Sequence, residues 1–181
     1  MVAVLAVPAI GRAQVTYDRT IQFSGHTWRV KASPSAGPGP NAFSDSVRAV
    51  RVDRRGRLQL RITRIDGVWR CAEVVSVESF GYGTYRFYLG SRVDNLDPIA
   101  VLGLFTWNDA DPAYHHREID IEFSRWGVPT DPTNAQYVVQ PFDTPGNLVR
   151  FTEPAAVSRS MHSFFWRPTE VDYQSLRRHI G

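Results

Sequence analysis

Apolar and polar positions alternate in short runs along most of the chain, which is the pattern of β-strands with one buried face. Turn signals separate these runs, among them Ser24-Gly25, Asp66-Gly67 and the Pro- and Gly-rich segment 33–40. No stretch with helical periodicity competes with them, and no internal repeat or linker is present. The expected strands are 21–23, 27–30, 47–52, 57–65, 68–75, 84–88, 101–107, 117–123, 135–139, 148–152 and 162–166. Short strands without βαβ alternation predict an all-β sandwich, jelly roll or barrel.

The strictest alternation lies in residues 117–123. Its acidic residues are Glu118, Asp120 and Glu122, and its apolar residues are Ile119, Ile121 and Phe123. On a strand, the three carboxylates point to one face and the apolar side chains to the other. Like charges on one face repel each other, so a strand that only faces solvent has no need of such a row.

Paired carboxylates on one rigid face are what glycoside hydrolysis needs, one ionised and one protonated. Backbones at positions i and i+4 of a strand are roughly 13 Å apart. Glu118 and Glu122 can lean inward to the roughly 5.5 Å of a retaining pair. Asp120 between them can hydrogen-bond one Glu and influence its ionisation. Because close carboxylates cannot all ionise cheaply, at least one pKa should rise. The alternative is an ordinary solvated strand face.

Composition narrows the class of protein. A chain of 181 residues is long enough for one domain with a sizeable core. The net charge of +3 is carried by arginine, with Lys31 as the single lysine. These arginines look scattered along the sequence, which leaves nucleic-acid binding unsupported. The single cysteine, Cys71, excludes an intramolecular disulfide and favours a buried structural thiol. No apolar stretch is long enough to span a membrane.

The N-terminal residues 1–13 have the features of a signal-peptide remnant. An apolar run from Val2 to Ile10 precedes Gly11-Arg12-Ala13, with small residues where a signal peptidase would require them. This predicts a secreted protein, extracellular or periplasmic, whose mature domain covers residues 14–181. The alternative is a buried first strand.

The segment Glu118–Phe123 resembles the signature of glycoside hydrolase family 16, the jelly-roll enzymes that include laminarinases and lichenases. Further similar segments are Cys71–Glu73 followed by Phe80–Gly83, then Leu104–Trp107, and finally Phe164–Pro168. Together they cover roughly residues 20–176 in the family's order. The resemblance implies a concanavalin A-like β-jelly-roll sandwich of two antiparallel sheets with a cleft on the concave face.

The same resemblance implies the catalytic roles. Glu118 matches the nucleophile, Glu122 the general acid/base, and Asp120 the acid that assists the nucleophile. We therefore expect Glu118 to stay ionised and Glu122 to hold the proton. The reaction would be a retaining double displacement on a β-linked glucan-type polysaccharide.

The substrate-binding residues that the resemblance implies come from several expected strands and loops: Asn41, Glu73, Phe105, Trp107, His116, Gln140, Phe142 and Trp166. Sugar rings have an apolar face that stacks on aromatic side chains. Phe105 could equally be a core residue, and His116 an ordinary histidine at the edge of the cleft. Trp28 and Trp69 are expected in the core.

Family members usually continue beyond the segment around Trp166, so we expect C-terminal strands to be missing here. A structural calcium ion sometimes found in the family cannot be assigned without them. The expected protein needs no cofactor, acts as a monomer on a polysaccharide and binds neither nucleic acid nor membrane. Two alternatives keep the same fold: a transglycosylase, and a carbohydrate-binding jelly roll without catalysis.

Overall fold

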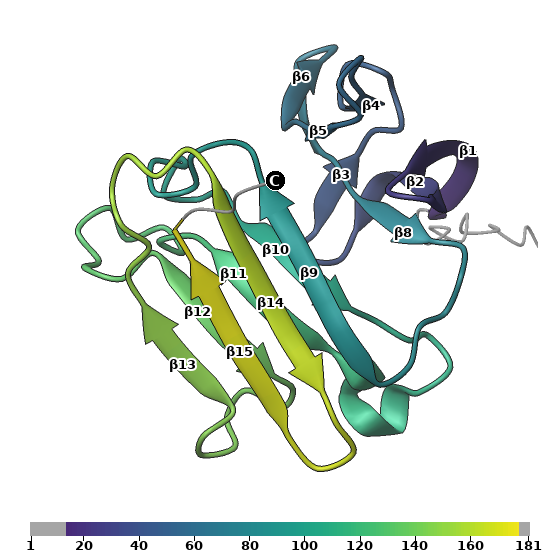
Figure 1. Ribbon diagram of the computed structural model, residues 1–181. Coiled ribbons are helices and arrows are strands. Elements are labelled where there is room, and N and C mark those ends of the chain that lie inside the picture. The colour runs from purple at the N-terminus through teal and green to yellow at the C-terminus, as the bar shows by residue number, and fades with distance from the viewer. Residues whose placement is uncertain (1–13, 178–181) are drawn as a thin grey trace, which may run out of the picture. The chain divides into compact units, whose positions relative to one another are not determined.

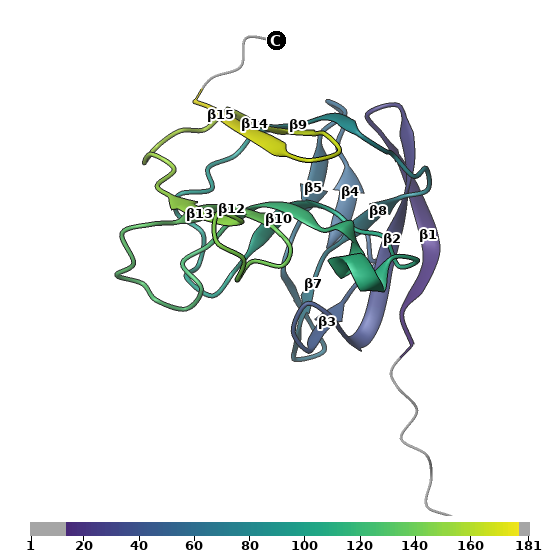
Figure 2. The same cartoon turned by 90° about the horizontal axis from the view of Figure 1, so that it is seen from below.

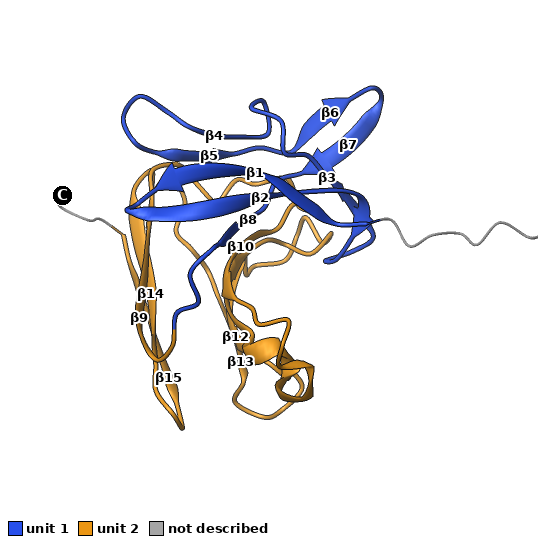
Figure 3. Cartoon of the chain, turned by 90° about the vertical axis from the view of Figure 1, so that its right-hand side faces the viewer, with its two compact units in different colours: residues 1–80 blue, residues 81–181 orange. Residues whose placement is uncertain are grey.

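The computed structural model describes residues 14–177, which form β-strands almost throughout (Figure 1). The chain divides into two compact units, residues 1–80 and 81–181, which Figure 3 colours separately. The predicted signal remnant, residues 1–13, lies outside the described residues. The single catalytic domain over 14–181 stays a prediction.

Unit 1 is built from eight strands in the described residues. They are β1 (Thr16–Phe23), β2 (His26–Ala36), β3 (Asn41–Phe43), β4 (Val50–Val52), β5 (Leu58–Leu60), β6 (Thr63–Ile65), β7 (Val68–Cys71) and β8 (Val74–Ser76). One sheet has the order β1-β2-β3-β7-β6, with β8 also paired to β2, and β4 and β5 form a separate hairpin. A small core of Val30, Ala49 and Val50 holds these elements together.

The two hairpin turns that the sequence predicts in this unit are present. Ser24 and Gly25 join β1 to β2, and Asp66 and Gly67 join β6 to β7. All four residues have positive φ angles, of 53°, 80°, 50° and 80° respectively. Two consecutive left-handed residues give a turn whose twist matches that of the flanking strands, which explains the Asp-Gly and Ser-Gly pairs.

Up to residue 177, where the described part of the chain ends, unit 2 contains two antiparallel sheets and one short helix. Its elements are β9 (Gly83–Leu89), β10 (Leu102–Thr106), the 3-10 helix η1 (Pro112–Arg117), β11 (Ile119–Phe123), β12 (Ala135–Val139), β13 (Leu148–Phe151), β14 (Ser160–Trp166) and β15 (Val171–Leu176). One sheet has the order β10-β11-β12-β13 and the other the order β15-β14-β9. Figure 2 shows them as two layers. Across residues 14–177, no helix is long and apolar enough to cross a membrane.

The core of unit 2 lies between these two sheets. Ile119, Ile121 and Phe123 of β11 are buried there, and Phe164 of β14 packs into the same cluster. The alternation of residues 117–123 is therefore a half-buried strand, as predicted. Its apolar face is fully committed to the core, which leaves the acidic face for the opposite side of the sheet.

Two predicted strands are each broken in two. Residues 57–65 separate into β5 and β6, because β5 pairs with β4 and β6 pairs with β7. Residues 68–75 separate into β7 and β8, because β7 pairs with β3 and β8 pairs with β2. A change of pairing partner leaves no mark on the apolar pattern, so alternation alone predicts one long strand.

Candidate active site

The three acidic side chains of residues 117–123 lie on the face of the four-stranded sheet that points away from the core. In the strand register, Asp120 lies opposite Phe105 of β10 and opposite Val138 of β12. Glu122 lies opposite Gly103 and Gln136. Directly opposed residues of an antiparallel pair share a face. We call this surface, with Phe105, Glu118, Asp120, Glu122 and Gln136, the acid face.

The backbone in front of Glu118 adopts an unusual conformation. His115, His116 and Arg117 have positive φ angles of 49°, 58° and 56°. Each non-glycine residue in this region costs of order 1–3 kcal/mol and persists only where its surroundings impose it. This turn ends η1, so β11 begins at Ile119 and Glu118 stands just before the strand.

Hydrogen bonds within residues 106–119 impose that conformation. The N–H of Asn108 donates to the carbonyl of His116 at 2.7 Å, and the N–H of His116 donates to the carbonyl of Asp111 at 3.0 Å. Thr106 Oγ1 donates to the Arg117 carbonyl at 2.8 Å and accepts from the Ile119 N–H at 3.1 Å. The backbone on both sides of Glu118 is therefore fixed by the end of β10.

Side chains of the same loop stack on one another. The rings of Trp107 and His116 are nearly parallel, with centroids 4.0 Å apart. Trp107 Nε1 donates to Asp109 Oδ1 at 2.8 Å, which satisfies its polar edge. Arg117 pairs with Asp111 at 3.0 Å and lies over the ring of Tyr114. The loop is a packed, hydrogen-bonded element that can hold Glu118 in place.

The pKa values of Asp120 and Glu118 are both raised, by different amounts. Burial, and then the negative charges of Glu118 and Glu122, raise the pKa of Asp120 to about 8, and its hydrogen bond to Glu118 adds to the rise. Burial, and then the charge of Glu122, also raise the pKa of Glu118, while His116 and the hydrogen bond from Asp120 lower it. At neutral pH Asp120 is therefore a protonated acid that donates to Glu118.

The rise of at least one pKa agrees with the sequence analysis, but its location differs. The expected holder of the proton was Glu122, whereas the largest rise falls on Asp120. The physical reason is depth, because Asp120 is only 5% exposed while Glu118 and Glu122 are half-buried. Desolvation penalises the charged form of the deepest carboxylate most.

Glu122 has a partner that sequence reasoning missed. Gln136 Nε2 donates to Glu122 Oε2 at 2.6 Å. The signal that could have found it is the register of the next strand, since Gln136 lies directly opposite Glu122 in β12. On the other side Glu122 faces Gly103, and the ring of Phe105 lies over this glycine, with Cδ1 3.5 Å from the position that a Cβ would take.

Several predicted binding residues belong to the strands and loops that carry the acids. Phe105 is on the acid face and 38% exposed, so it is not a core residue. The N–H of Gln140 donates to the carbonyl of Glu118 at 3.1 Å, and its Oε1 accepts from the N–H of Phe142. Trp107 and Phe142 are exposed. Phe105 lies on β10, Trp107 and His116 lie between β10 and β11, and Gln140 and Phe142 follow β12. The cleft itself stays a prediction.

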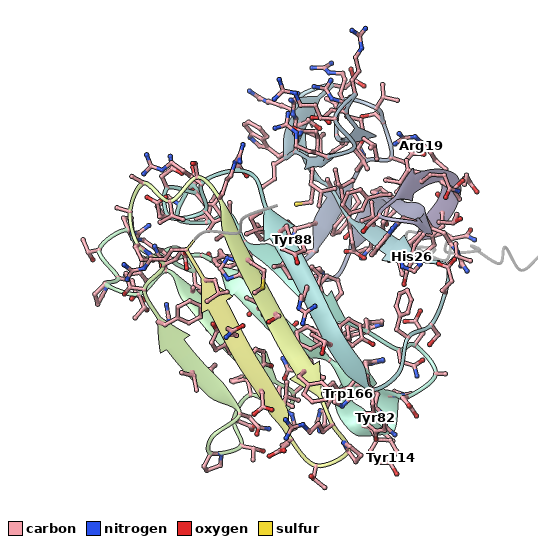
Figure 4. The ribbon with its side chains drawn as sticks, viewed as in Figure 1. Arg19, His26, Tyr82, Tyr88, Tyr114 and Trp166 are labelled. Carbon is pink, nitrogen blue, oxygen red and sulfur yellow. The ribbon has the colours of Figure 1, made fainter. Side chains whose placement is uncertain are left out.

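Trp166 corrects the sequence analysis. It ends β14, in the other sheet of unit 2, and packs against the core cluster instead of joining the acid face. Its ring meets that of Tyr82 edge-on with centroids 5.0 Å apart (Figure 4). It also lines a cavity of about 450 Å³ together with Tyr137 and Tyr173, and none of the three acids lines that cavity. In β14 it has the same parity as Phe164, a core residue, which explains its inward direction.

The two predicted residues of unit 1 are placed within that unit. Asn41 is exposed on β3 and donates from Nδ2 to the Pro38 carbonyl at 2.6 Å. Glu73 pairs with the ammonium group of Lys31 at 2.8 Å. That contact occupies Glu73 Oε2, so a sugar hydroxyl would have to use the other oxygen. Their roles in binding stay predictions.

Three other expectations concern unit 1. Trp69 is 64% exposed, so its expected core position is wrong. Trp28 is half-buried, and its Nε1 donates to the Phe23 carbonyl. Cys71 is a free thiol that is only half-buried, and burial, followed by the nearby charge of Glu73, raises its pKa. Alternation placed Trp69 in a strand but does not specify which face of that strand is covered, and the face of β7 that carries Trp69 is exposed.

Comparison with known proteins supports the fold. No family model matches the chain, and no curated protein sequence matches it. Among solved structures, the beta-glucanase of Bacillus licheniformis is similar with a TM-score of 0.62 and 20% sequence identity, over 92% of this chain and 75% of that one. The chain therefore has a β-jelly-roll fold, as predicted. Within the described residues, no group of three or more His, Cys, Asp or Glu side chains could hold a metal ion.

Proposed function

We propose that this protein is a retaining glycoside hydrolase of the family 16 type that cleaves a β-linked glucan-type polysaccharide. The observation that carries the proposal is the acid face, where two half-buried glutamates flank a buried, protonated aspartate on one strand. A row of acids that only kept a strand soluble would not need a buried member with a pKa of about 8. The similar fold of a protein whose name is beta-glucanase supports the substrate class.

In the first step, Glu122, which takes up a proton before the bond is cleaved, donates this proton to the glycosidic oxygen while Glu118 attacks the anomeric carbon. The bond from that carbon to the leaving oxygen breaks, and an ester to Glu118 forms with inversion. The hydrogen bond from Asp120 fixes the orientation of the Glu118 carboxylate. Gln136 fixes that of Glu122. Such positioning increases the rate, because the two carboxyl groups are already oriented before the reaction begins.

In the second step, water replaces the departed sugar. Glu122, now ionised, takes a proton from the water, whose oxygen attacks the anomeric carbon and releases Glu118. While Glu118 is an ester it carries no charge, so one of the two charges that raise the pKa of Asp120 is absent. Glu122 becomes negatively charged in the first step, and the neutral ester of Glu118 does not repel this charge. Glu122 therefore stays ionised and can act as a base.

A polysaccharide outside the cell is too large to enter intact, so its cleavage takes place outside the cytoplasm. We therefore include secretion, to the extracellular space or the periplasm, in the proposal. We also propose action as a monomer without a cofactor, since two carboxylates and water complete the chemistry.

The proposal is tested with Glu118→Ala and Glu122→Ala variants and mixed-linkage or β-1,3-glucan as substrate. Each variant should lose at least about a thousandfold in kcat, while Glu170→Gln, an exposed acid of unit 2, should keep full activity. The first-formed product of the unmodified protein should be the β-anomer, because two inversions restore the configuration. An α-anomer as the first product would show an inverting enzyme and refute the role of Glu118.

Azide distinguishes the two glutamates from each other. In Glu118→Ala, azide can occupy the space under the anomeric carbon and give an α-glycosyl azide from an activated β-glycoside. In Glu122→Ala, the nucleophile still forms the ester, and azide then gives the β-glycosyl azide. Transfer of glycan to glycan in place of reducing-end release would instead indicate a transglycosylase. Binding without either reaction would indicate a carbohydrate-binding jelly roll.

A further inference from the structure

Positive charge is concentrated in one short segment of unit 1. Residues 48–64 contain seven arginines and a single acidic residue, Asp53, which gives this segment a net charge of +6. Since the whole protein has a net charge of +3, the remainder of the chain has a net charge of −3. The arginines are Arg48, Arg51, Arg54, Arg55, Arg57, Arg61 and Arg64, and all seven are exposed. A concentration of this kind indicates a polyanionic partner.

The β4–β5 hairpin directs part of this charge outward. Val50 and Leu58 point to the small core of unit 1, so the alternate positions point away from it. Arg51 lies opposite Gln59 on that outer face, and Arg61 follows at the same parity. The turn between the strands contributes Arg54 and Arg55. Figure 4 shows nitrogen-tipped side chains crowded over β4, β5 and β6.

Most of these arginines have no acidic partner. Arg57 pairs with Asp53 at 2.8 Å. Within residues 14–177, none of the other six takes part in an ion pair with a carboxylate. Exposed guanidinium groups without a carboxylate partner are available for hydrogen bonds to an anion.

The neighbouring hairpin adds an exposed aromatic ring. Trp69 of β7 lies directly opposite Arg64 of β6, so the indole and the guanidinium share one face. Trp69 is 64% exposed, and the side chain of Arg64 donates to the carbonyl of Gly67 in the turn. Trp69 is the only aromatic residue between positions 48 and 70. A sugar ring can stack on one indole, whereas proteins that bind single-stranded nucleic acid stack successive bases on several aromatic side chains.

We propose that residues 48–70 form a binding surface for a polysaccharide whose sugars carry carboxylates. The arginines bind the carboxylates, and Trp69 stacks on the apolar face of a sugar ring. The surface uses neither the acid face nor any residue of the catalytic machinery, so it would attach the protein to an acidic matrix while the acids cleave another chain. The choice of a polysaccharide as the ligand rests on the proposed function. The observation that positive charge is concentrated in this surface does not.

The test uses polygalacturonate as the probe and compares two triple variants of the full chain. Arg51→Gln with Arg61→Gln and Arg64→Gln removes three charges from the surface. Arg29→Gln with Arg86→Gln and Arg159→Gln removes three exposed charges elsewhere, so both have the same net charge. The Kd for polygalacturonate should rise at least tenfold in the first and less than threefold in the second. The salt dependence of binding should flatten only in the first.

Trp69→Ala should raise the Kd by about fivefold without changing the salt dependence, and Trp69→Phe should restore most of the affinity. Hydrolysis of a neutral glucan should be unchanged in all these variants, so a failure here is separable from a failure of the proposed function. Equal weakening by the two triple variants would overturn the proposal as unspecific charge attraction. Tighter binding of heparin or single-stranded DNA, with no effect of Trp69→Ala, would overturn the ligand class.

Discussion

Two of the places where unit 2 buries polar side chains differ in how the hydrogen bonds of these side chains are satisfied. Between the sheets, His162 is fully buried, with Nδ1 2.7 Å from Ser175 Oγ and Nε2 2.8 Å from Ser160 Oγ. Tyr137 Oη lies 2.5 Å from the same Ser175 hydroxyl. Every partner in this interior network is neutral, and both ring nitrogens are occupied.

On the acid face, the partners of a buried carboxylate are other carboxylates. Asp120 can donate one proton to Glu118, but Glu122 remains close enough to raise the pKa of both. Repulsion of this kind weakens the fold and is retained where chemistry uses it. If the proposed function holds, the comparison separates a buried polar group that serves the structure from one that serves a reaction.

The two sites also respond to pH in opposite directions. The pKa of Asp120 is raised from 3.8 to about 8, so folding is favoured by the proton and stability is lost as pH rises through this window. Burial lowers the pKa of His162 from 6.5 to about 4, so the unfolded chain binds its proton first and stability is lost as pH falls from 6.5 to about 4. A single substitution at Asp120 or at His162 should remove the contribution of that residue to the pH dependence of stability.

Asp120→Asn should have the largest effect on stability. The amide cannot ionise, so the free energy of unfolding should fall much less between pH 4 and pH 8, although the contribution of Glu118 should remain. At pH 8 the variant should be more stable than the unmodified protein, by several kcal/mol. Urea unfolding at a series of pH values measures this, with Asp18→Asn as the exposed control. A variant that is less stable at pH 8 would show that Asp120 is structural, like His162.

His162→Gln should act on the acidic side of the profile. Glutamine can hydrogen-bond a serine hydroxyl but gains no proton, so the loss of stability between pH 6.5 and pH 4, about 3 kcal/mol for His162, should disappear. At neutral pH the variant should be less stable, because glutamine does not fill the site of the imidazole against Phe123. Its kcat for glucan, measured well below the melting temperature, should be unchanged. A fall in kcat without a change in the stability profile would connect this network to the reaction.

Two tryptophans test the same contrast between interior and acid face. Trp166→Ala should cost about 2–3 kcal/mol in stability, because this ring packs against the core, and should leave KM unchanged. Trp107→Ala should do the reverse, raising KM several-fold with little change in melting temperature, because this ring is exposed beside the acids. Melting curves and glucan kinetics on both variants decide this. If Trp166→Ala raises KM with no loss of stability, our placement of this ring in the interior is wrong.

The sequence predicted best what depends on local alternation. The core face of β11, the two hairpin turns and the all-β fold follow from the period of two and from Asp-Gly and Ser-Gly pairs. A carboxylate row on one face was visible for the same reason. The consequence for ionisation was predicted only in part, because the depth of Asp120 is set by neighbouring strands, which the alternation does not specify.

The errors have the same origin. Whether a residue of a strand faces the core or the substrate depends on which sheet the strand joins, and Trp166 ended in the other sheet from the acids. Trp69 is exposed because, within residues 14–177, its face of the hairpin is not covered. The arginines look scattered along the chain but gather on two short hairpins. Gln136 became visible only through the register of β11 and β12.

Gln136→Leu should give the smallest effect and the sharpest test of the acid face. Removing the 2.6 Å hydrogen bond leaves Glu122 free to rotate, with an apolar group beside one of its oxygens. A hydrogen bond to a charged group contributes about 1.5–3 kcal/mol, so kcat should fall by roughly tenfold to a hundredfold with KM nearly unchanged. The alkaline limb of the pH–rate profile should move upward, because ionised Glu122 loses a donor. Gln174→Leu, an exposed glutamine of β15, should change neither quantity. If Gln136→Leu lowers the melting temperature but leaves the pH–rate profile in place, Gln136 supports only the sheet, and the assignment of Glu122 as acid/base loses its positioning residue.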